Sequence, residues 1–410
     1  MSGGAATSTG HPGWQRTLWI VFVVQLISAT GFGVMFPFLT LYVAALGTNT
    51  SLPLTFWAAM AFSGQAIAMA IASPFWGAIG DRFGHRRMLE RATLGGALIL
   101  LAMGFARNAE ELVFLRVIQG IVTGTIAAVN ALVAVIAPRE KLGYALGIAQ
   151  LGLYLGIAFG PVIGGIIADL VGYRATYAVT SALLLGAGLL VRFGVPAVRS
   201  TAKKQRGAGD PRVLLAAPGV AAVYGVRFLA QVGQAMLLPI LPLLVVELLH
   251  TGRGINSATG LLIGVSAGAA TITAVALGRL GDRIGHRRVL IGAAFVAGLA
   301  FLPQTLVTEF WHLLALTVIS GAATGGIVPA LGALLVRLTP PGTEGATYGI
   351  DNSVSSAGRA VAPLIAAAIV EVASTRAVIG LNSVLFIGAA VLALLVVPVL
   401  APLQKQAPQS

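Results

Sequence analysis

The segment Gly-Asp-Arg-Phe-Gly-His-Arg-Arg at residues 80–87 returns as Gly-Asp-Arg-Ile-Gly-His-Arg-Arg at residues 281–288, an offset of 201 positions. Each copy is strongly basic and follows a long apolar run. In a separate part of the chain, residues 160–169 match residues 362–371 at an offset of 202. Separated matches at nearly one offset predict an internal repeat, so we expect two halves with the same fold.

The composition indicates a membrane protein. Hydrophobic residues make up 57% of the chain and charged residues only 10%, whereas a soluble domain carries about 25% charge. The 52 glycines fit this class, because glycine lets membrane helices approach closely. The net charge of +13 does not indicate nucleic acid, since the basic residues fall between apolar runs. The absence of cysteine excludes disulfides and thiol chemistry.

Twelve apolar runs are long enough to cross a bilayer, which takes about 20 residues. The first is too long for the apolar core of a signal peptide, so we expect it to be retained. The runs lie at residues 17–46, 53–79, 88–106, 109–136, 141–169, 174–193, 214–249, 256–280, 288–307, 310–337, 343–371 and 376–400.

These runs predict an all-α polytopic membrane protein, with twelve transmembrane helices in two pseudo-symmetric six-helix bundles. We expect the N-terminal bundle at residues 1–195, a cytoplasmic linker at 196–213 and the C-terminal bundle at 214–410. The linker contains the longest polar stretch of the chain, residues 199–212, at the midpoint of the sequence.

The basic residues predict the orientation. Of the 26 Lys and Arg residues, nineteen fall on the side of the two termini, four fall on the other side, and three lie within spans. Because Lys and Arg are enriched in cytoplasmic loops, this bias predicts that both termini are in the cytoplasm. We therefore expect a multi-pass protein of the inner (cytoplasmic) cell membrane.

The repeated loop resembles the signature that follows the second span in the major facilitator superfamily, with His85 where that family usually has Arg or Lys. Gly77 and Gly80 permit close packing, Gly84 permits a tight turn, and Asp81 can complement the dipole of a nearby helix. An ordinary basic cytoplasmic loop is the alternative. The resemblance implies a conformational role for Gly77, Asp81, Arg82, Gly84 and Arg86, and for Gly278, Asp282, Arg283 and Gly285 of the second copy.

Arg116 opens the segment Arg-Val-Ile-Gln-Gly within the fourth span. A guanidinium inside a span is costly unless it faces protein or water. The segment resembles the Arg-x-x-Gln-Gly signature of the same superfamily, which implies a part in proton transfer. The alternative is an arginine that reaches back to the bilayer surface.

The fifth span carries a regular series of glycines followed by a proline. Glycines four residues apart make a smooth face on which a neighbouring helix can pack, and a proline adds a kink point. The series also resembles the antiporter signature of drug exporters, which symporters of the superfamily generally lack, and so implies export. Its members are Gly152, Gly156, Gly160, Pro161 and Gly164.

The repeat also points to a coupling site. At an offset of 202, Asp351 corresponds to Ala149, and Arg359 and Arg227 also correspond to neutral residues. Ionisable groups within spans indicate function, and a poorly hydrated carboxyl group suits a reversible proton carrier. We expect Asp351, Arg116 and Arg359 to couple protons, with Arg227 as the partner of Asp351. A fixed ion pair between the seventh and eleventh spans is the alternative.

In the resembled family, the first, fourth, seventh and tenth spans line the transport cavity. Polar and aromatic residues on these spans are therefore candidates for substrate contact. The alternative for each amide is a hydrogen bond between helices. The alternative for the aromatic residue is packing in the core. The candidates are Gln25, Phe36, Asn130, Arg227, Gln231 and Gln234.

Together these features predict proton-coupled antiport that exports amphipathic small molecules or drugs by alternating access. The expected partners are a small-molecule substrate, protons and the bilayer, with no cofactor, metal, catalytic residue or nucleic acid, and the resemblance implies a monomer. An enzyme is disfavoured because phosphate-binding and nucleophile motifs are missing from the sequence.

Two alternatives remain open. The stretch from Gln25 to Tyr42 has no acidic residue, which favours an exporter or flippase for an anionic, zwitterionic or lipid-like metabolite. A non-transporting membrane sensor fits less well, because both loop copies and the glycine series are intact.

Overall fold

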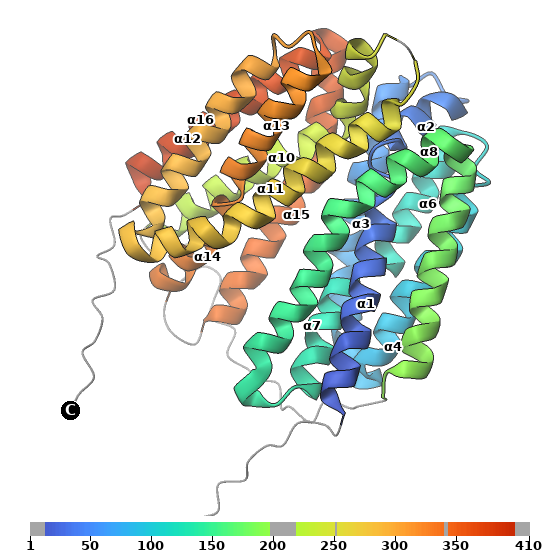
Figure 1. The fold of residues 1–410 in the computed structure, drawn as a ribbon, viewed down its shortest axis with the longest axis vertical. Coiled ribbons are helices and arrows are strands. Elements are labelled where there is room, and N and C mark those ends of the chain that lie inside the picture. The colour runs from blue at the N-terminus through green and yellow to red at the C-terminus, as the bar shows by residue number, and fades with distance from the viewer. Residues whose placement is uncertain (1–12, 197–218, 251, 340–342, 398–410) are drawn as a thin grey trace, which may run out of the picture.

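The computed structural model describes residues 13–196, 219–250, 252–339 and 343–397. Within these residues the chain forms helices joined by short connections and contains no strand. Figure 1 shows the blue-to-green helices of the N-terminal half beside the yellow-to-red helices of the C-terminal half. The predicted linker at 196–213 lies almost entirely outside the described residues.

The N-terminal half consists of α1 (Trp14–Gly33), α2 (Leu39–Leu46), α3 (Leu54–Phe83), α4 (His85–Glu90), the π-helical η1 (Arg91–Gly95), α5 (Gly96–Met103), α6 (Ala109–Val122), α7 (Thr125–Ile136), the 3-10 turn η2 (Arg139–Lys141) and α8 (Leu142–Gly194). The C-terminal half consists of α10 (Val220–Leu248), α11 (Ile255–Ile284), α12 (His286–Gln304), α13 (Phe310–Thr324), α14 (Ile327–Leu338), α15 (Glu344–Val372) and α16 (Thr375–Val396).

The described chain makes the twelve predicted passes, although only nine of its helical segments are long and apolar enough to cross a bilayer as single units. Helix α8 contains two passes, because its backbone turns at Gly172, where φ is +81°. The third pass is divided among α4, η1 and α5, and the fourth between α6 and α7. None of these pieces reaches the length of a span alone.

Three predicted spans are interrupted where the sequence predicted continuous runs, one of them the run at 310–337, which is divided between α13 and α14. The run at 109–136 breaks between α6 and α7, where Gly124 adopts a φ of +140° that only glycine reaches readily. The run at 17–46 breaks between α1, which ends at Gly33, and α2, which begins at Leu39. The apolar runs therefore predicted where the spans lie, but they did not predict whether each span is one continuous helix.

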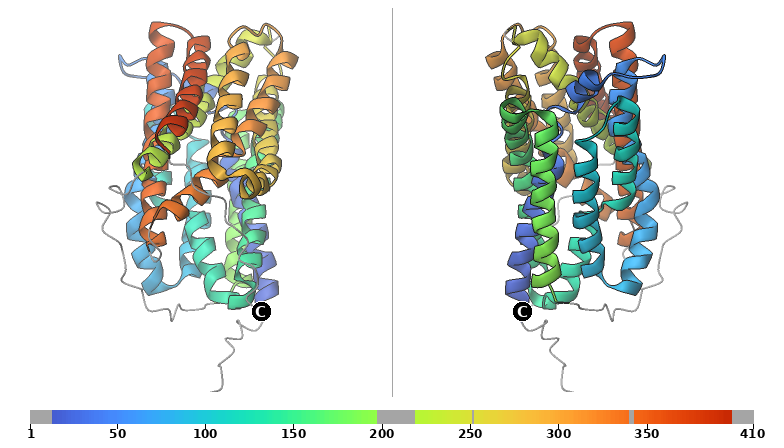
Figure 2. Two further views of the ribbon diagram at one scale, coloured as in Figure 1. Left: turned by 90° about the vertical axis from the view of Figure 1, so that its left-hand side faces the viewer. Right: turned by 90° about the vertical axis from the view of Figure 1, so that its right-hand side faces the viewer.

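Each half has hydrophobic cores of its own. Phe38 and Leu184 belong to one buried cluster of the N-terminal half, and Leu290 and Phe386 belong to a cluster of the C-terminal half. We call the end where α1 and α10 begin and α16 ends the terminal end, and the other end the opposite end; the views in Figure 2 show the helices of both halves running between them.

Helix α8 packs against α1 through the predicted glycine series. A Cβ atom built at Gly156 would lie 2.8 Å from the carbonyl oxygen of Leu26, and one at Gly164 would lie 2.0 Å from that of Val34. Gly152 and Gly160 make similar backbone contacts with α1. The packing interpretation of the series is therefore confirmed, because any side chain at these positions would push the two helices apart.

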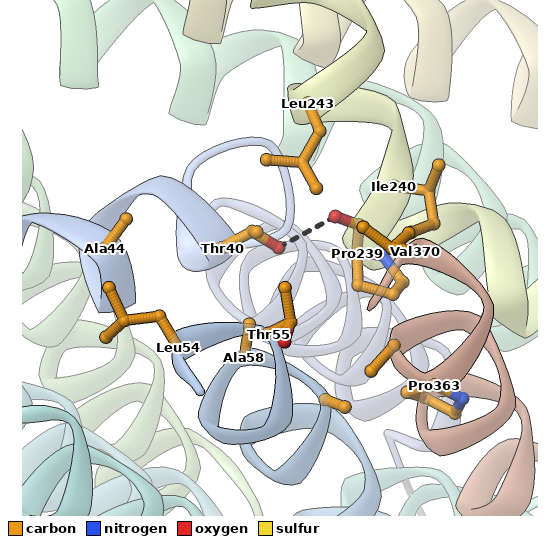
Figure 3. A pocket seen from close by; sticks show the side chains of 12 residues that line it. Thr40, Ala44, Leu54, Thr55, Ala58, Pro239, Ile240, Leu243, Pro363 and Val370 are labelled. Carbon is orange, nitrogen blue, oxygen red and sulfur yellow. Dashed lines mark hydrogen bonds between the residues drawn. The ribbon is translucent and has the colours of Figure 1, made fainter. Parts of the chain in front are cut away.

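The same stretch of α8 crosses α11 of the other half, again through glycines. A Cβ atom at Gly165 would lie 2.1 Å from the carbonyl oxygen of Asn256, and one at Gly260 would lie 2.2 Å from that of Pro161. The corresponding crossing of α3 and α15 is looser. Alanines and Pro363 there line an apolar cavity of about 80 Å³, which Figure 3 shows from close by.

Hydrogen bonds between the halves lie at the opposite end. The hydroxyl of Thr40 donates to the carbonyl oxygen of Pro239 at 3.0 Å, the contact dashed in Figure 3. Asp169 of α8 accepts hydrogen bonds from the start of α11, and Glu371 of α15 accepts one from Thr55 near the start of α3. The structure therefore holds the two halves together at the end remote from the termini.

We expect Gly164→Ala to destabilise the fold by about 1–3 kcal/mol, the usual cost of overpacking a close contact. Gly147→Ala is the matched control in the same helix, because a Cβ there meets nothing within 4 Å. The control should unfold at the same temperature or slightly higher, since alanine is the better helix former. Thermal unfolding of the purified protein measures both variants, and equal losses would contradict the role of Gly164 in packing.

Candidate functional site

Arg116 lies in α6 with its side chain only 2% exposed. Its Nε donates to the carbonyl oxygen of Ala61 in α3 at 2.7 Å. Its Nη1 donates to Gln119 Oε1 at 2.7 Å and contacts Met35 Sδ at 2.9 Å, and its Nη2 donates to Gln65 Oε1 at 3.3 Å. The guanidinium therefore points into the N-terminal half, which rules out an arginine that reaches the bilayer surface.

The charge of Arg116 is held by neutral acceptors alone. Among the described residues no carboxylate lies within ion-pair distance of it. The buried hydroxyl of Tyr177 makes no hydrogen bond with any described group. A buried guanidinium without a counter-ion is tolerated only where its N–H donors are satisfied, and here α3, α6 and the turn between α1 and α2 supply the acceptors.

A second charged cluster lies between α10 and α15 of the C-terminal half. Arg227 Nε lies 3.3 Å from Asp351 Oδ1 and also donates to Ser355 Oγ at 2.7 Å. The two charged side chains are 15% and 20% exposed. Arg359, two turns along α15, donates to Ser356 Oγ at 3.1 Å and is not paired with Asp351. The expected pairing of Asp351 with Arg227 therefore forms, and it bridges the seventh and eleventh spans.

The remaining cavity candidates are not gathered into one site. Gln25 is buried, and Gln231 packs on Gly358 of α15 beside the Arg227 cluster. Gln150 Nε2 of α8 donates to Asn130 Oδ1 of α7 at 3.3 Å, which is the helix-to-helix hydrogen bond given as the alternative.

The two other candidates differ in their surroundings. Phe36 stacks on Phe62 with ring centroids 6.2 Å apart, whereas Gln234 is exposed. Among these candidates, the contact of Gln231 with Gly358 is the one that lies beside the Arg227 cluster in the described residues.

The repeated loops end α3 and α11 in matching ways. Gly84 and Gly285 follow these helices with φ values of +93° and +97°, so the predicted tight turn is present in both copies. Arg82 and Arg283 are exposed.

The structure describes the side chain of the acidic residue in the second loop copy, Asp282, but not that of Asp81 in the first. Asp282 is 73% exposed and lies 3.1 Å from His286 Nε2. Gly77 and Gly278 lie within α3 and α11, and the side chain of Asp81 is outside the described part of the structure. The expected contact of Asp81 with a helix terminus therefore stays a prediction.

A contact missed by the sequence analysis ties each loop to the last helix of its own half. Arg86 donates to the carbonyl oxygen of Arg192 near the end of α8. Its repeat counterpart, Arg287, donates to the carbonyl oxygens of Val397 at 2.7 Å and Leu394 at 2.5 Å at the end of α16. Cations suit helix C-termini, where carbonyl groups lack partners. The identical spacing in the two copies was the only sequence signal for this role.

Known proteins are similar to this chain over most of its length. The family model described as Major Facilitator Superfamily matches residues 21–227 and again residues 223–410. The multidrug resistance protein MdtG of Salmonella paratyphi A is 34% identical over 374 residues, which cover 89% of this chain and 91% of the relative. MdtG of Citrobacter koseri is 33% identical over the same shares.

Solved structures show the same fold at low sequence identity. A bacterial homolog of the human lysosomal transporter Spinster, in an inward-facing and occupied conformation, superposes with a TM-score of 0.77 at 14% identity, covering 94% of this chain and 97% of that one. Its inward-facing, unoccupied form gives a TM-score of 0.74 at the same identity, covering 95% and 96%. With both halves matched by one family model, this chain belongs to the Major Facilitator Superfamily of membrane transporters.

Proposed function

We propose that this protein exports amphipathic small molecules in exchange for protons, by alternating access. The observation that carries the proposal is the ion pair of Asp351 with Arg227, which lies inside two spans and beside a further cation, Arg359. Ionisable groups at such depth mark ion and proton pathways. The names of the MdtG relatives and the resemblance of the α8 glycine series to an antiporter signature support export of drug-like compounds.

Protonation of Asp351 removes the charge that faces Arg227 and leaves the guanidinium bound to Ser355. The attraction between α10 and α15 then weakens, because it depends on opposite charges in a poorly hydrated place. Helix α15 also carries Pro363 and Glu371, which contact α3 of the other half. In this proposal α15 connects the proton site to the contact between the halves.

We propose a separate role for Arg116, because its cluster lies in the other half and contains no carboxylate among the residues that the structure describes. A permanent positive charge held by neutral groups provides a fixed potential within the N-terminal half. Proton release from a carboxyl group is favoured near such a charge. Arg116 and Arg359 therefore act as fixed cations, and Asp351 is the group that gains and loses the proton.

The charge balance supports a second candidate substrate class. Three arginines and a single aspartate lie clearly inside the predicted spans, so the interior favours negative ligands. Export or flipping of an anionic, zwitterionic or lipid-like metabolite fits this balance better than export of a lipophilic cation. A panel of cationic and anionic amphiphiles, tested by proton flux in liposomes, distinguishes the two classes.

Asp351→Asn should abolish substrate-dependent proton flux in liposomes with an internal pH dye, while substrate binding persists. The amide cannot carry the proton, and it remains isosteric with the carboxyl group beside Arg227. Glu247→Gln is the matched control, because Glu247 is a half-exposed carboxylate at the opposite end of α10, 3.6 Å from Arg376. Full flux in Asp351→Asn would remove this residue from the coupling role.

Arg116→Lys should lower both stability and transport, although the charge is kept. An ammonium group cannot reproduce the planar fork that reaches acceptors in α3, in α6 and in the turn between α1 and α2, and each charged hydrogen bond lost costs about 1.5–3 kcal/mol. Arg107→Lys is the control, since the side chain of Arg107 is exposed. Thermal unfolding and proton flux are measured on both variants; a fully active Arg116→Lys would contradict the proposed geometry.

We also propose that both termini and the linker lie in the cytoplasm, as the distribution of basic residues predicts. The absence of cysteine makes a direct test simple. In intact cells, a membrane-impermeant maleimide should label Ser51→Cys, which is exposed at the opposite end, and spare Glu140→Cys, which is exposed at the terminal end. Labelling in the reverse order would invert the proposed orientation.

A further inference from the structure

Two carboxylates at the opposite end bind residues of the other half, and only the contact of Glu371 with α3 enters the proposed function. Asp169 lies near the end of the first pass of α8, just before the turn at Gly172, and Glu371 lies in the last turn of α15. They occupy matching places in the repeat, 202 positions apart. Each accepts hydrogen bonds from the first turn of a helix that belongs to the other half.

Asp169 binds the start of α11 with both carboxylate oxygens. Its Oδ1 accepts from Asn256 Nδ2 at 2.7 Å and from the Asn256 backbone N–H at 3.4 Å. Its Oδ2 accepts from the Ser257 backbone N–H at 2.8 Å and from Ser257 Oγ at 2.5 Å. The first N–H groups of a helix lack internal partners and attract negative charge, so Asp169 fills the place of an N-cap side chain.

Glu371 makes the matching contact on the other side of the molecule. Its Oε1 accepts from the hydroxyl of Thr55, the second residue of α3. Thr55 and Ser257 are themselves 202 positions apart, so the same carboxylate-to-hydroxyl hydrogen bond occurs twice in corresponding places. Because both the donors and the acceptors correspond in the repeat, these two hydrogen bonds are unlike chance contacts at the surface.

The helices that receive these carboxylates have no side-chain cap of their own. The N-cap residues are Pro53 for α3 and Gly254 for α11, and neither can supply an acceptor from its side chain. By contrast, α6 and α16 begin at the same end and are capped locally, by Asn108 and by Ser374. The cap of α11 is thus supplied by the other half, whereas at the start of α3 Glu371 binds the Thr55 hydroxyl.

We propose that Asp169 and Glu371 are a matched pair of latches that hold the opposite end closed, and that both release whenever this end opens. Each bond joins one half to the other, so it is lost when the halves rock apart and re-forms when they close. Asp169 acts through the start of α11 and Glu371 through the Thr55 side chain of α3, so both are positioning residues for the transport cycle. The place of the latches in export rests on the proposed function, whereas their effect on closure does not.

Closure is measured with a reporter cysteine in the otherwise cysteine-free chain. Ala59→Cys suits this purpose, because Ala59 is 1% exposed and lines the cavity between the halves at the closed end. In nanodiscs, the rate of maleimide labelling at position 59 reports how often this end opens.

Adding Asp169→Ala should raise the labelling rate about fivefold, the change that corresponds to a typical lost N-cap. Glu371→Ala should raise it less, since its bond is to a hydroxyl alone, and the two effects should multiply in the double variant. Asp169→Asn should give an intermediate rate, because the amide keeps an acceptor and loses the charge.

Two controls separate opening from general loss of structure. Glu110→Gln and Glu247→Gln remove carboxylates at the same end whose partners, Thr48 and Arg376, belong to their own halves, so labelling should not change. Ala97→Cys places a second reporter in the core of the N-terminal half, where labelling should stay low in every variant.

Unchanged labelling at position 59 in the double variant would overturn the proposal, as would an equal rise at positions 59 and 97. Increased labelling in a protein that shows no substrate-dependent proton flux would support the latches and count against proton-coupled export. The experiment therefore tests the latches and proton-coupled export independently of each other.

Discussion

The close approach of α8 to two other helices is the constraint on which the rest of the structure depends. Lipid provides no hydrophobic force between membrane helices, so their association relies on tight van der Waals contact and on polar bonds. Helix α8 meets α1 of its own half and α11 of the other half within a few residues of Pro161, and glycine forms the contact on both sides. The packing of α8 against α1 therefore constrains where α11 and the rest of the C-terminal half can lie.

Charge inside the spans follows a different rule in each half. The N-terminal half keeps Arg116 charged by surrounding it with neutral acceptors, whereas the C-terminal half sets Asp351 against Arg227. Among the described residues, the first arrangement has no acidic member that could change its charge. The second contains Asp351, which can gain or lose a proton. Asp351 lies in α15, and the same helix contacts the other half through Glu371. The repeat has thus kept its fold while the chemistry of its two copies has diverged.

The sequence predicted the twelve passes, the two halves and the pairing of Asp351 with Arg227, because length, hydropathy and the repeat are properties of the chain itself. The sequence did not predict the break at Gly124, since glycine is common within membrane helices and its presence alone does not indicate a positive φ. The hydrogen bond of Asn130 with Gln150, and those of Arg86 and Arg287 with helix ends, depend on how helices rotate against one another. No periodicity in one segment encodes that rotation.

The duplicated contacts of Asp169 with Ser257 and of Glu371 with Thr55 give the boundary between the halves a particular symmetry. In an isologous interface of a homodimer, position i of one subunit meets position j of its partner, and j meets i in return. The two halves of this chain meet in that way, although they are joined covalently and differ in sequence. The boundary therefore has the form of a two-fold dimer interface within a single polypeptide, and each half contributes one carboxylate and one hydroxyl to the matched contacts.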